Sequence, residues 1–271
     1  MKITKLTPII RKLTAGNANM FTGPGTNTYL LGEKEVTVID PGPPMVSHIE
    51  DLISITGKSL KQILITHTHP DHSPGASILK KMTGVPVFGL STESSRKMDE
   101  EIDIDKMLNH GDEIKTSEYS IEVIHTPGHA SNHLCYFLID ENILFTGDHI
   151  MDGSTVVIAP PDGNMIEYLQ SLKLLKEYPI KTIAPGHGDL IQDPMSIVDA
   201  TIEHRLNREK KIIKKLEKLG SASIDELVND VYDDVASFLH PIAKWSLEAH
   251  LIKLVENKIV SKNKQQYDLI E

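Results

Sequence analysis

The chain has 271 residues, of which 39% are hydrophobic and 24% are charged, and its formal net charge is -10. This length predicts one large domain or one domain with a small appendage, and the composition excludes a disordered or fibrous chain. The acidic balance argues against loose binding to nucleic acid or anionic membranes, so a polyanionic substrate would need a local positive centre.

The single cysteine and the first residues favour an intracellular protein. Cys135 lies in an apolar run, which predicts a buried strand residue, and one cysteine excludes an intrachain disulfide. The opening stretch MKITKLTPIIRKLTAGN is basic but lacks the continuous apolar core of a signal peptide, and no stretch reaches transmembrane length. We therefore expect a cytoplasmic protein without membrane contact.

Short apolar runs that end in Gly, Pro, Asp or Asn predict a series of strands in the first 160 residues. In chain order these runs are NTYLLG (27–32), EVTVID (35–40), QILIT (62–66), VPVFG (85–89), SIEVIHT (120–126), HLCYFLI (133–139) and NILFTGD (142–148). Helical spacing between them predicts helices at 46–56 and 74–84. This mixture of strands and helices indicates an α/β fold.

Helices dominate after residue 160. Asn164 fits the N-cap of a helix that stops before Pro179, and a short strand follows at 181–188. Beyond it the pattern predicts three helices and a hairpin, at 197–220, 221–232, 237–260 and 258–271. This order is typical of a winged-helix module, so we place a domain boundary near residue 200, with domains over 1–199 and 200–271.

Histidines and aspartates follow several predicted strands directly. The stretch ITHTHPDHSPG at 65–75 carries four of them, and the next three follow later strands; the residues are His67, His69, Asp71, His72, His129, Asp148 and His187. Loops at strand ends converge on one rim of a sheet, which is the usual place for a site.

These residue types are metal donors, because imidazole nitrogens and carboxylate oxygens bind zinc at about 2.0 to 2.2 Å. Residues two apart on an extended stretch face the same side, so His67 and His69 can hold one ion while Asp71 and His72 turn toward a second. Seven donors suffice for two ions. A turn with chance polar residues explains one histidine, but not several at strand ends, so the pattern indicates metal chemistry.

The motifs THTHPDH, TPGH, FTGD and PGHG, in this order, resemble those of the metallo-beta-lactamase superfamily. The resemblance implies a four-layer αβ/βα sandwich with two metal ions at one edge, two Zn²⁺ per chain, with iron or manganese as alternatives. It assigns one ion to His67, His69 and His129 and the other to Asp71, His72 and His187, with Asp148 as the bridge.

Further stretches resemble the beta-lactamase-like protein 2 group, which also carries a C-terminal winged-helix-like domain: GPGTNTYLLG, MIEYLQSLK, EHRLNREKKI and LHPIAKWSLEAHLIKL. This resemblance implies a zinc-dependent hydrolase and possible endoribonuclease, which cleaves phosphodiester bonds in single-stranded RNA by a metal-bridging hydroxide. Asp71 is the expected catalytic residue, because it can orient that hydroxide and take its proton.

Other functions stay open, because the same ligands serve an ester, thioester, lactone, amide or phosphodiester. The alternative is a small-molecule hydrolase, namely a glyoxalase II-like thioesterase, lactonase or beta-lactamase. Iron-dependent dioxygenase chemistry and a non-catalytic nucleic-acid-binding module are two further hypotheses. From residue 200 onward 12 Lys+Arg balance 12 Asp+Glu, so the acidity lies in the first part and the tail is favoured for any RNA contact.

Three residues outside the motifs are candidate substrate contacts, namely His133, Tyr168 and Arg205. Each also has a structural interpretation: His133 as a locally satisfied histidine, Tyr168 as a packed ring, and Arg205 as the partner of a helix carboxylate. The helical tail is also a candidate surface for homodimerisation.

Overall fold

The structure, a computed structural model, describes residues 3–91 and 102–270. The chain divides into two compact units. The first comprises Met1–Thr126, Asn132–Ser154 and Tyr178–Pro194, and the second comprises Pro127–Ser131, Thr155–Glu177 and Met195–Glu271. The domain boundary near residue 200 stays a prediction. Among the described residues, no helix has the length and apolar character needed to cross a membrane.

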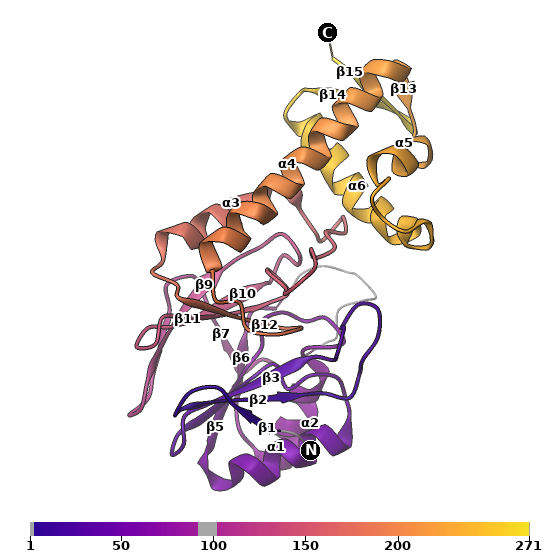
Figure 1. The fold of residues 1–271 in the computed structure, drawn as a ribbon. Helices are drawn as coiled ribbons and strands as arrows, with labels where there is room; N and C mark the ends of the chain where they lie inside the picture. Colours follow the sequence, from indigo (N-terminus) through magenta and orange to yellow (C-terminus); the bar gives the residue numbers. More distant parts are fainter. Residues whose placement is uncertain (1–2, 92–101, 271) are drawn as a thin grey trace. The chain divides into compact units, whose positions relative to one another are not determined.

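The first unit contains a seven-stranded sheet in which chain order is also strand order. Most of its strands are labelled in Figure 1. Its strands are β1 (Ile3–Lys5), β2 (Ile10–Thr14), β3 (Asn27–Leu31), β4 (Val36–Ile39), β5 (Leu60–Leu64), β6 (Val87–Gly89) and β7 (Lys106–Met107). Pairing is antiparallel from β1 to β4 and parallel from β4 to β7. The parallel pairs β4–β5 and β5–β6 need crossovers, and α1 (Val46–Thr56) with η1 (Gly57–Ser59) and α2 (Pro74–Thr83) provide them.

A second sheet of the same unit has the order β12-β11-β10-β9-β8. Its strands are β8 (Glu113–Lys115), β9 (Ser120–His125), β10 (Leu134–Leu138), β11 (Ile143–Gly147) and β12 (Thr182–Pro185). All pairs are antiparallel except β11 with β12, which are parallel.

Side-chain alternation along β3 explains how the first sheet packs on both faces. Leu30 belongs to a cluster with residues of α1 and α2 such as Ile49 and Leu79. Tyr29 and Leu31 instead join the core that contains residues of the second sheet, among them Phe145. Strands covered on both faces read as continuous apolar runs, which is why NTYLLG and LCYFL are recognisable in the sequence.

The second unit is mainly helical. Its elements are α3 (Met165–Leu174), η2 (Leu175–Glu177), α4 (Pro194–Leu219), β13 (Ser221–Ala222), α5 (Ile224–Val231), η3 (Ser237–Leu239), α6 (His240–Glu256), β14 (Val260–Asn263) and β15 (Gln266–Leu269). The side chain of Asn164 accepts hydrogen bonds from two backbone N–H groups in the first turn of α3. This confirms the prediction that Asn164 is the N-cap of this helix. The sequence of three helices followed by the β14–β15 hairpin confirms the winged-helix pattern.

The predicted strands and helices are confirmed, but the sequence pattern misses several short strands, namely β1, β2, β7, β8 and β13. Four of these have only two or three residues, which is too short for a periodic pattern. β2 has five residues, but two of them are basic and only partly buried. Its sequence therefore resembles a polar N-terminal segment and not a strand.

Candidate metal centre

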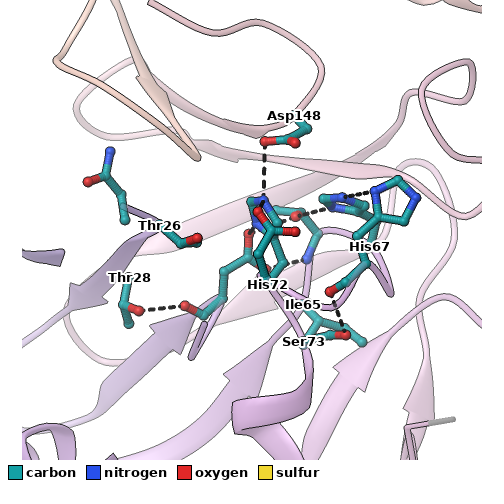
Figure 2. Close-up of polar contacts among 12 residues, drawn as sticks. Thr26, Thr28, Ile65, His67, His72, Ser73 and Asp148 are labelled. Atoms are coloured by element: carbon teal, nitrogen blue, oxygen red, sulfur yellow. Dashed lines mark hydrogen bonds and ion pairs between the residues drawn. The ribbon is translucent and has the colours of Figure 1, made fainter. Parts of the chain in front are cut away.

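The histidines and aspartates that follow the predicted strands meet at one rim of the first unit. The loop after β5 and the ends of β11 and β12 carry six of them: His67, His69, Asp71, His72, Asp148 and His187. Figure 2 shows the Asp148 carboxylate facing the His72 ring. Strand ends therefore position the side chains in the way that the sequence predicts.

Four of these side chains form a compact group of donors, whose ligand atoms all lie within 4.8 Å of one another: Asp71, His72, Asp148 and His187. Nε2 of His72 lies 3.2 Å from Nε2 of His187 and 3.2 Å from Oδ1 of Asp148. Oδ2 of Asp71 lies 3.1 Å from Nε2 of His187 and 3.4 Å from Nε2 of His72.

These distances fit a tetrahedral metal site. Ligand atoms at about 2.0 to 2.1 Å from a tetrahedral ion are separated by roughly 3.3 to 3.4 Å along each edge of the tetrahedron. The separations that involve a histidine nitrogen span 3.1 to 3.4 Å. Two imidazole nitrogens with two carboxylate oxygens suit Zn²⁺ and are also accepted by iron and manganese. The group therefore fits one divalent ion.

The charges of this group shift the pKa of every member. Burial lowers the pKa of His72, but the charges of Asp71 and Asp148 outweigh it and raise that pKa well above its usual range. Burial also lowers the pKa of His187, but the effect of Asp148 in particular outweighs it and raises that pKa to about 9. Burial acts to raise the pKa of both carboxyls, yet the histidines hold both below the usual range. A bound cation would replace imidazole protons, so metal binding at this group releases protons.

His67 and His69 form a separate pair of donors. Nε2 of His67 lies 3.0 Å from Nδ1 of His69, and the two rings meet edge to face at 76°. Burial, and then the charges of His72 and His69, lower the pKa of His67 well below its usual range. A low pKa keeps the imidazole neutral, which is the form that binds a metal.

His129 belongs to the second unit, on the segment Pro127–Ser131. Its Nδ1 donates a hydrogen bond to the carbonyl oxygen of Val157 at 2.7 Å. A carbonyl acceptor on Nδ1 selects the tautomer that holds its lone pair on Nε2. The tautomer suits a metal ligand, and the place of His129 beside His67 and His69 stays a prediction.

The three predicted substrate contacts are buried side chains. In the first unit, Nδ1 of His133 lies 2.9 Å from Oγ1 of Thr126. In the second unit, the guanidinium of Arg205 lies 5.2 Å from the centroid of the Tyr168 ring. Their role in substrate binding stays a prediction.

Sequence reasoning misses Asp40, which follows β4 at the same rim. Its Oδ2 accepts from Nδ1 of His72 at 2.8 Å, and its Oδ1 accepts from the backbone N–H of Thr66 at 2.7 Å. The sequence holds the relevant signal, because Asp40 ends a predicted strand just as Asp148 does. An aspartate in this place is also an ordinary strand terminator, so the pattern alone does not single it out.

Comparison with known families identifies the chain. The profile of the metallo-beta-lactamase superfamily matches residues 21–187, and that of the beta-lactamase associated winged helix domain matches residues 223–268. The chain therefore belongs to the metallo-beta-lactamase superfamily. It is a hydrolase of that superfamily with a candidate dinuclear metal site, and its fold is the superfamily's α/β sandwich with a C-terminal helical winged-helix domain.

Individual proteins support the same conclusion. The chain is 31% identical to the beta-lactamase-like protein 2 homolog of Caenorhabditis elegans, over 95% of this chain and 88% of that protein. It is 28% identical to the atrochrysone carboxyl ACP thioesterase of Aspergillus chevalieri, over 96% and 85%. The crystal structure of a metallo-beta-lactamase family protein from Thermus thermophilus superposes with a TM-score of 0.83 at 20% identity, over 98% of this chain and 100% of that one. This last likeness concerns the fold.

Proposed function

We propose that the protein is a zinc-dependent endoribonuclease with two Zn²⁺ per chain, which cleaves phosphodiester bonds in single-stranded RNA. The observation that carries the metal-dependent part is the four-donor group of Asp71, His72, Asp148 and His187, with its separations of 3.1 to 3.4 Å. His67 and His69, with His129 as third ligand, are proposed for the other ion, and Asp148 for the bridge. Bound ions of this kind lower the pKa of water toward about 7 and polarise the oxygen of the scissile bond.

The RNA part of the proposal is supported by the similarity to the beta-lactamase-like protein 2 homolog and by the winged-helix match. Two divalent ions would bring four positive charges against two carboxylates, which is the local positive centre that an acidic chain needs to bind a polyanion. Two lysines of α4 contribute less, because Lys211 contacts Asp233 at 2.5 Å and Lys215 contacts Asp230. The metal centre is therefore the proposed phosphate-binding region.

Asp71 is the proposed proton acceptor of the reaction. Its side chain is 29% exposed, compared with 13% for Asp148, 6% for His187 and 0% for His72. A carboxylate that remains accessible while its Oδ2 contacts His187 can orient an attacking water and accept a proton from it.

A small-molecule thioesterase is the second candidate. The observation that favours it is the 28% identity with a carboxyl ACP thioesterase over 96% of this chain. A thioesterase would use the same donor group, because a metal ion bound there can polarise the carbonyl oxygen of a thioester just as it can polarise a phosphoryl oxygen.

The two candidates are separated by assaying a labelled single-stranded RNA beside a thioester and a beta-lactam, with metal content measured on each sample. We expect the wild type to cleave RNA and Asp71→Ala to lose that activity. Asp199→Ala is the control, because this exposed carboxylate on α4 contacts Lys176 at 2.6 Å and is not a member of the donor group. Thioester or lactam turnover without RNA cleavage would replace the proposal by the second candidate.

We also propose that the second unit mediates homodimerisation. Phe238 is 72% exposed and Trp245 is 42% exposed, and large apolar side chains that form a contiguous exposed patch mark interaction sites. Light scattering at micromolar concentration tests this, and a dimer that becomes a monomer in Phe238→Ser would support it. A monomeric wild type would contradict it.

A further inference from the structure

A short segment of the second unit, residues 156–158, links the predicted ligand His129 to two helices. The segment lies in no helix or strand. Its polar backbone groups instead bond to side chains: the Val156 carbonyl oxygen accepts from Nη2 of Arg205 at 2.5 Å, and the Ile158 N–H donates to Oγ of Ser246 at 3.1 Å. Between them, the Val157 carbonyl oxygen accepts from Nδ1 of His129.

The Val157 carbonyl controls how His129 presents its other nitrogen. A metal-binding histidine is oriented by the partner of its second ring nitrogen, and loss of such a partner costs roughly 10- to 100-fold in metal affinity. Moving this carbonyl would therefore rotate the His129 ring or let its proton move from Nδ1 to Nε2. The peptide groups on both sides of Val157 determine where the carbonyl points.

Both flanking anchors are buried. Arg205 on α4 is 2% exposed, its guanidinium lies against the Tyr168 ring, and its hydrogen bond to Val156 is charge-assisted. Ser246 on α6 is also buried. Side chains from two different helices thus fix the two peptides around Val157.

The loop that carries His129 is held independently. Oγ of Ser171 donates to the Pro127 carbonyl oxygen at 2.8 Å, and the N–H of Asn164 donates to the Gly128 carbonyl oxygen at 2.8 Å. These bonds fix the backbone at 127–128, while the Val157 carbonyl oxygen contacts the ring of His129 itself.

We propose that Arg205 and Ser246 are positioning residues that hold His129 in its metal-binding orientation through residues 156–158. Helices α4 and α6 thereby contribute to the binding of this ion without supplying a ligand themselves. The inference rests on the proposed function, because it requires His129 to bind an ion.

The test compares metal binding of the full-length wild type, Ser246→Ala, Arg205→Lys and His129→Ala, with zinc affinity measured by chelator competition and the Co²⁺-substituted absorption spectrum as a second readout. We expect Ser246→Ala and Arg205→Lys to weaken one of two sites about tenfold or more and to change the Co²⁺ spectrum, while the other site keeps its affinity.

Arg208→Lys is the matched control. Arg208 is a buried arginine of the same helix, but its guanidinium contacts the Val231 carbonyl oxygen and the Asp234 carboxylate, not residues 156–158. We expect it to lower thermal stability and to leave both zinc affinities unchanged. If Arg205→Lys does not fold, Ser246→Ala decides the question.

The outcomes separate the two proposals. If His129→Ala still binds two ions with wild-type affinity, the ligand role of His129 fails, and the positioning role fails with it. If His129→Ala loses one ion while folded Ser246→Ala and Arg205→Lys keep both wild-type affinities, the positioning role alone is overturned.

Discussion

The carboxylate of Asp40 accepts a hydrogen bond from Nδ1 of His72 at 2.8 Å, and the same carboxylate accepts from the N–H and the hydroxyl of Thr66 at 2.7 Å each. These bonds join the end of β4 to the loop after β5. They fix both the ring of His72 and the backbone that precedes His67. One buried residue thus organises the donors of both proposed ions.

Asp40→Asn is expected to weaken metal binding at the group of Asp71, His72, Asp148 and His187. Because the Thr66 N–H needs an acceptor at the Oδ1 position, the amide would keep its oxygen there and turn its NH2 donor toward Nδ1 of His72. This favours the tautomer that carries its proton on Nε2, the nitrogen that points into the group. We expect at least a 10- to 100-fold loss of zinc affinity with little loss of fold, measured by metal analysis and circular dichroism. Wild-type zinc content in a folded Asp40→Asn would refute this account.

Gly186→Ala is expected to disturb the same group by steric pressure. A Cβ at this position would lie 2.6 Å from Cε1 of His72 and 2.9 Å from Oδ1 of Asp148. We expect the number of bound zinc ions to fall and hydrolysis to decrease by more than tenfold, since small displacements of ligands impair catalysis strongly. Gly16→Ala is the control, because its Cβ would meet only Cε of Met45, at 3.4 Å. Full zinc content in Gly186→Ala would show that the group tolerates the methyl group.

Much of the first unit could be predicted because strands such as β3 and β10 are buried on both faces and so form continuous apolar runs. The donors of the loop at 65–75 were recognisable because they are contiguous. Asp40 was not, because it lies 32 residues before His72 and its partner is known only once β4 and β5 pair. The bonds to residues 156–158 were hidden for the same reason, since Arg205 reaches Val156 across 49 residues.

His250 predicts a pH dependence of stability in the second unit. Burial lowers its pKa to about 4, against a smaller opposing effect of Glu209, whose Oε1 lies 3.3 Å from Nδ1 of His250. An unfolded histidine titrates near 6.5, so between pH 6.5 and 4 the unfolded chain binds a proton that the folded chain does not. The contribution of His250 to the free energy of unfolding is therefore complete above about pH 6.5. It decreases by up to roughly 3 kcal/mol as the pH is lowered to 4.

Chemical denaturation from pH 7.5 to 4.5 measures this effect. His250→Gln is expected to be less stable at pH 7.5 but to lose less stability on acidification than the wild type does. His110→Gln, at an exposed loop position, serves as the control and should retain the wild-type slope. Equal slopes for His250→Gln and the wild type would assign the pH dependence to other groups.

Cys135 is expected to be chemically inert in the folded protein. Burial raises the pKa of its thiol to about 12, and Oγ1 of Thr126 lies 3.2 Å from its sulfur. The thiolate, which is the reactive form, is therefore scarce at pH 8, and the fully buried sulfur is also inaccessible to reagents. A thiol-specific chromophoric reagent should label no cysteine in the native protein and one per chain in guanidinium chloride. Labelling of the native protein within seconds would contradict the buried position of β10, because reagent can reach this sulfur only if the strand opens.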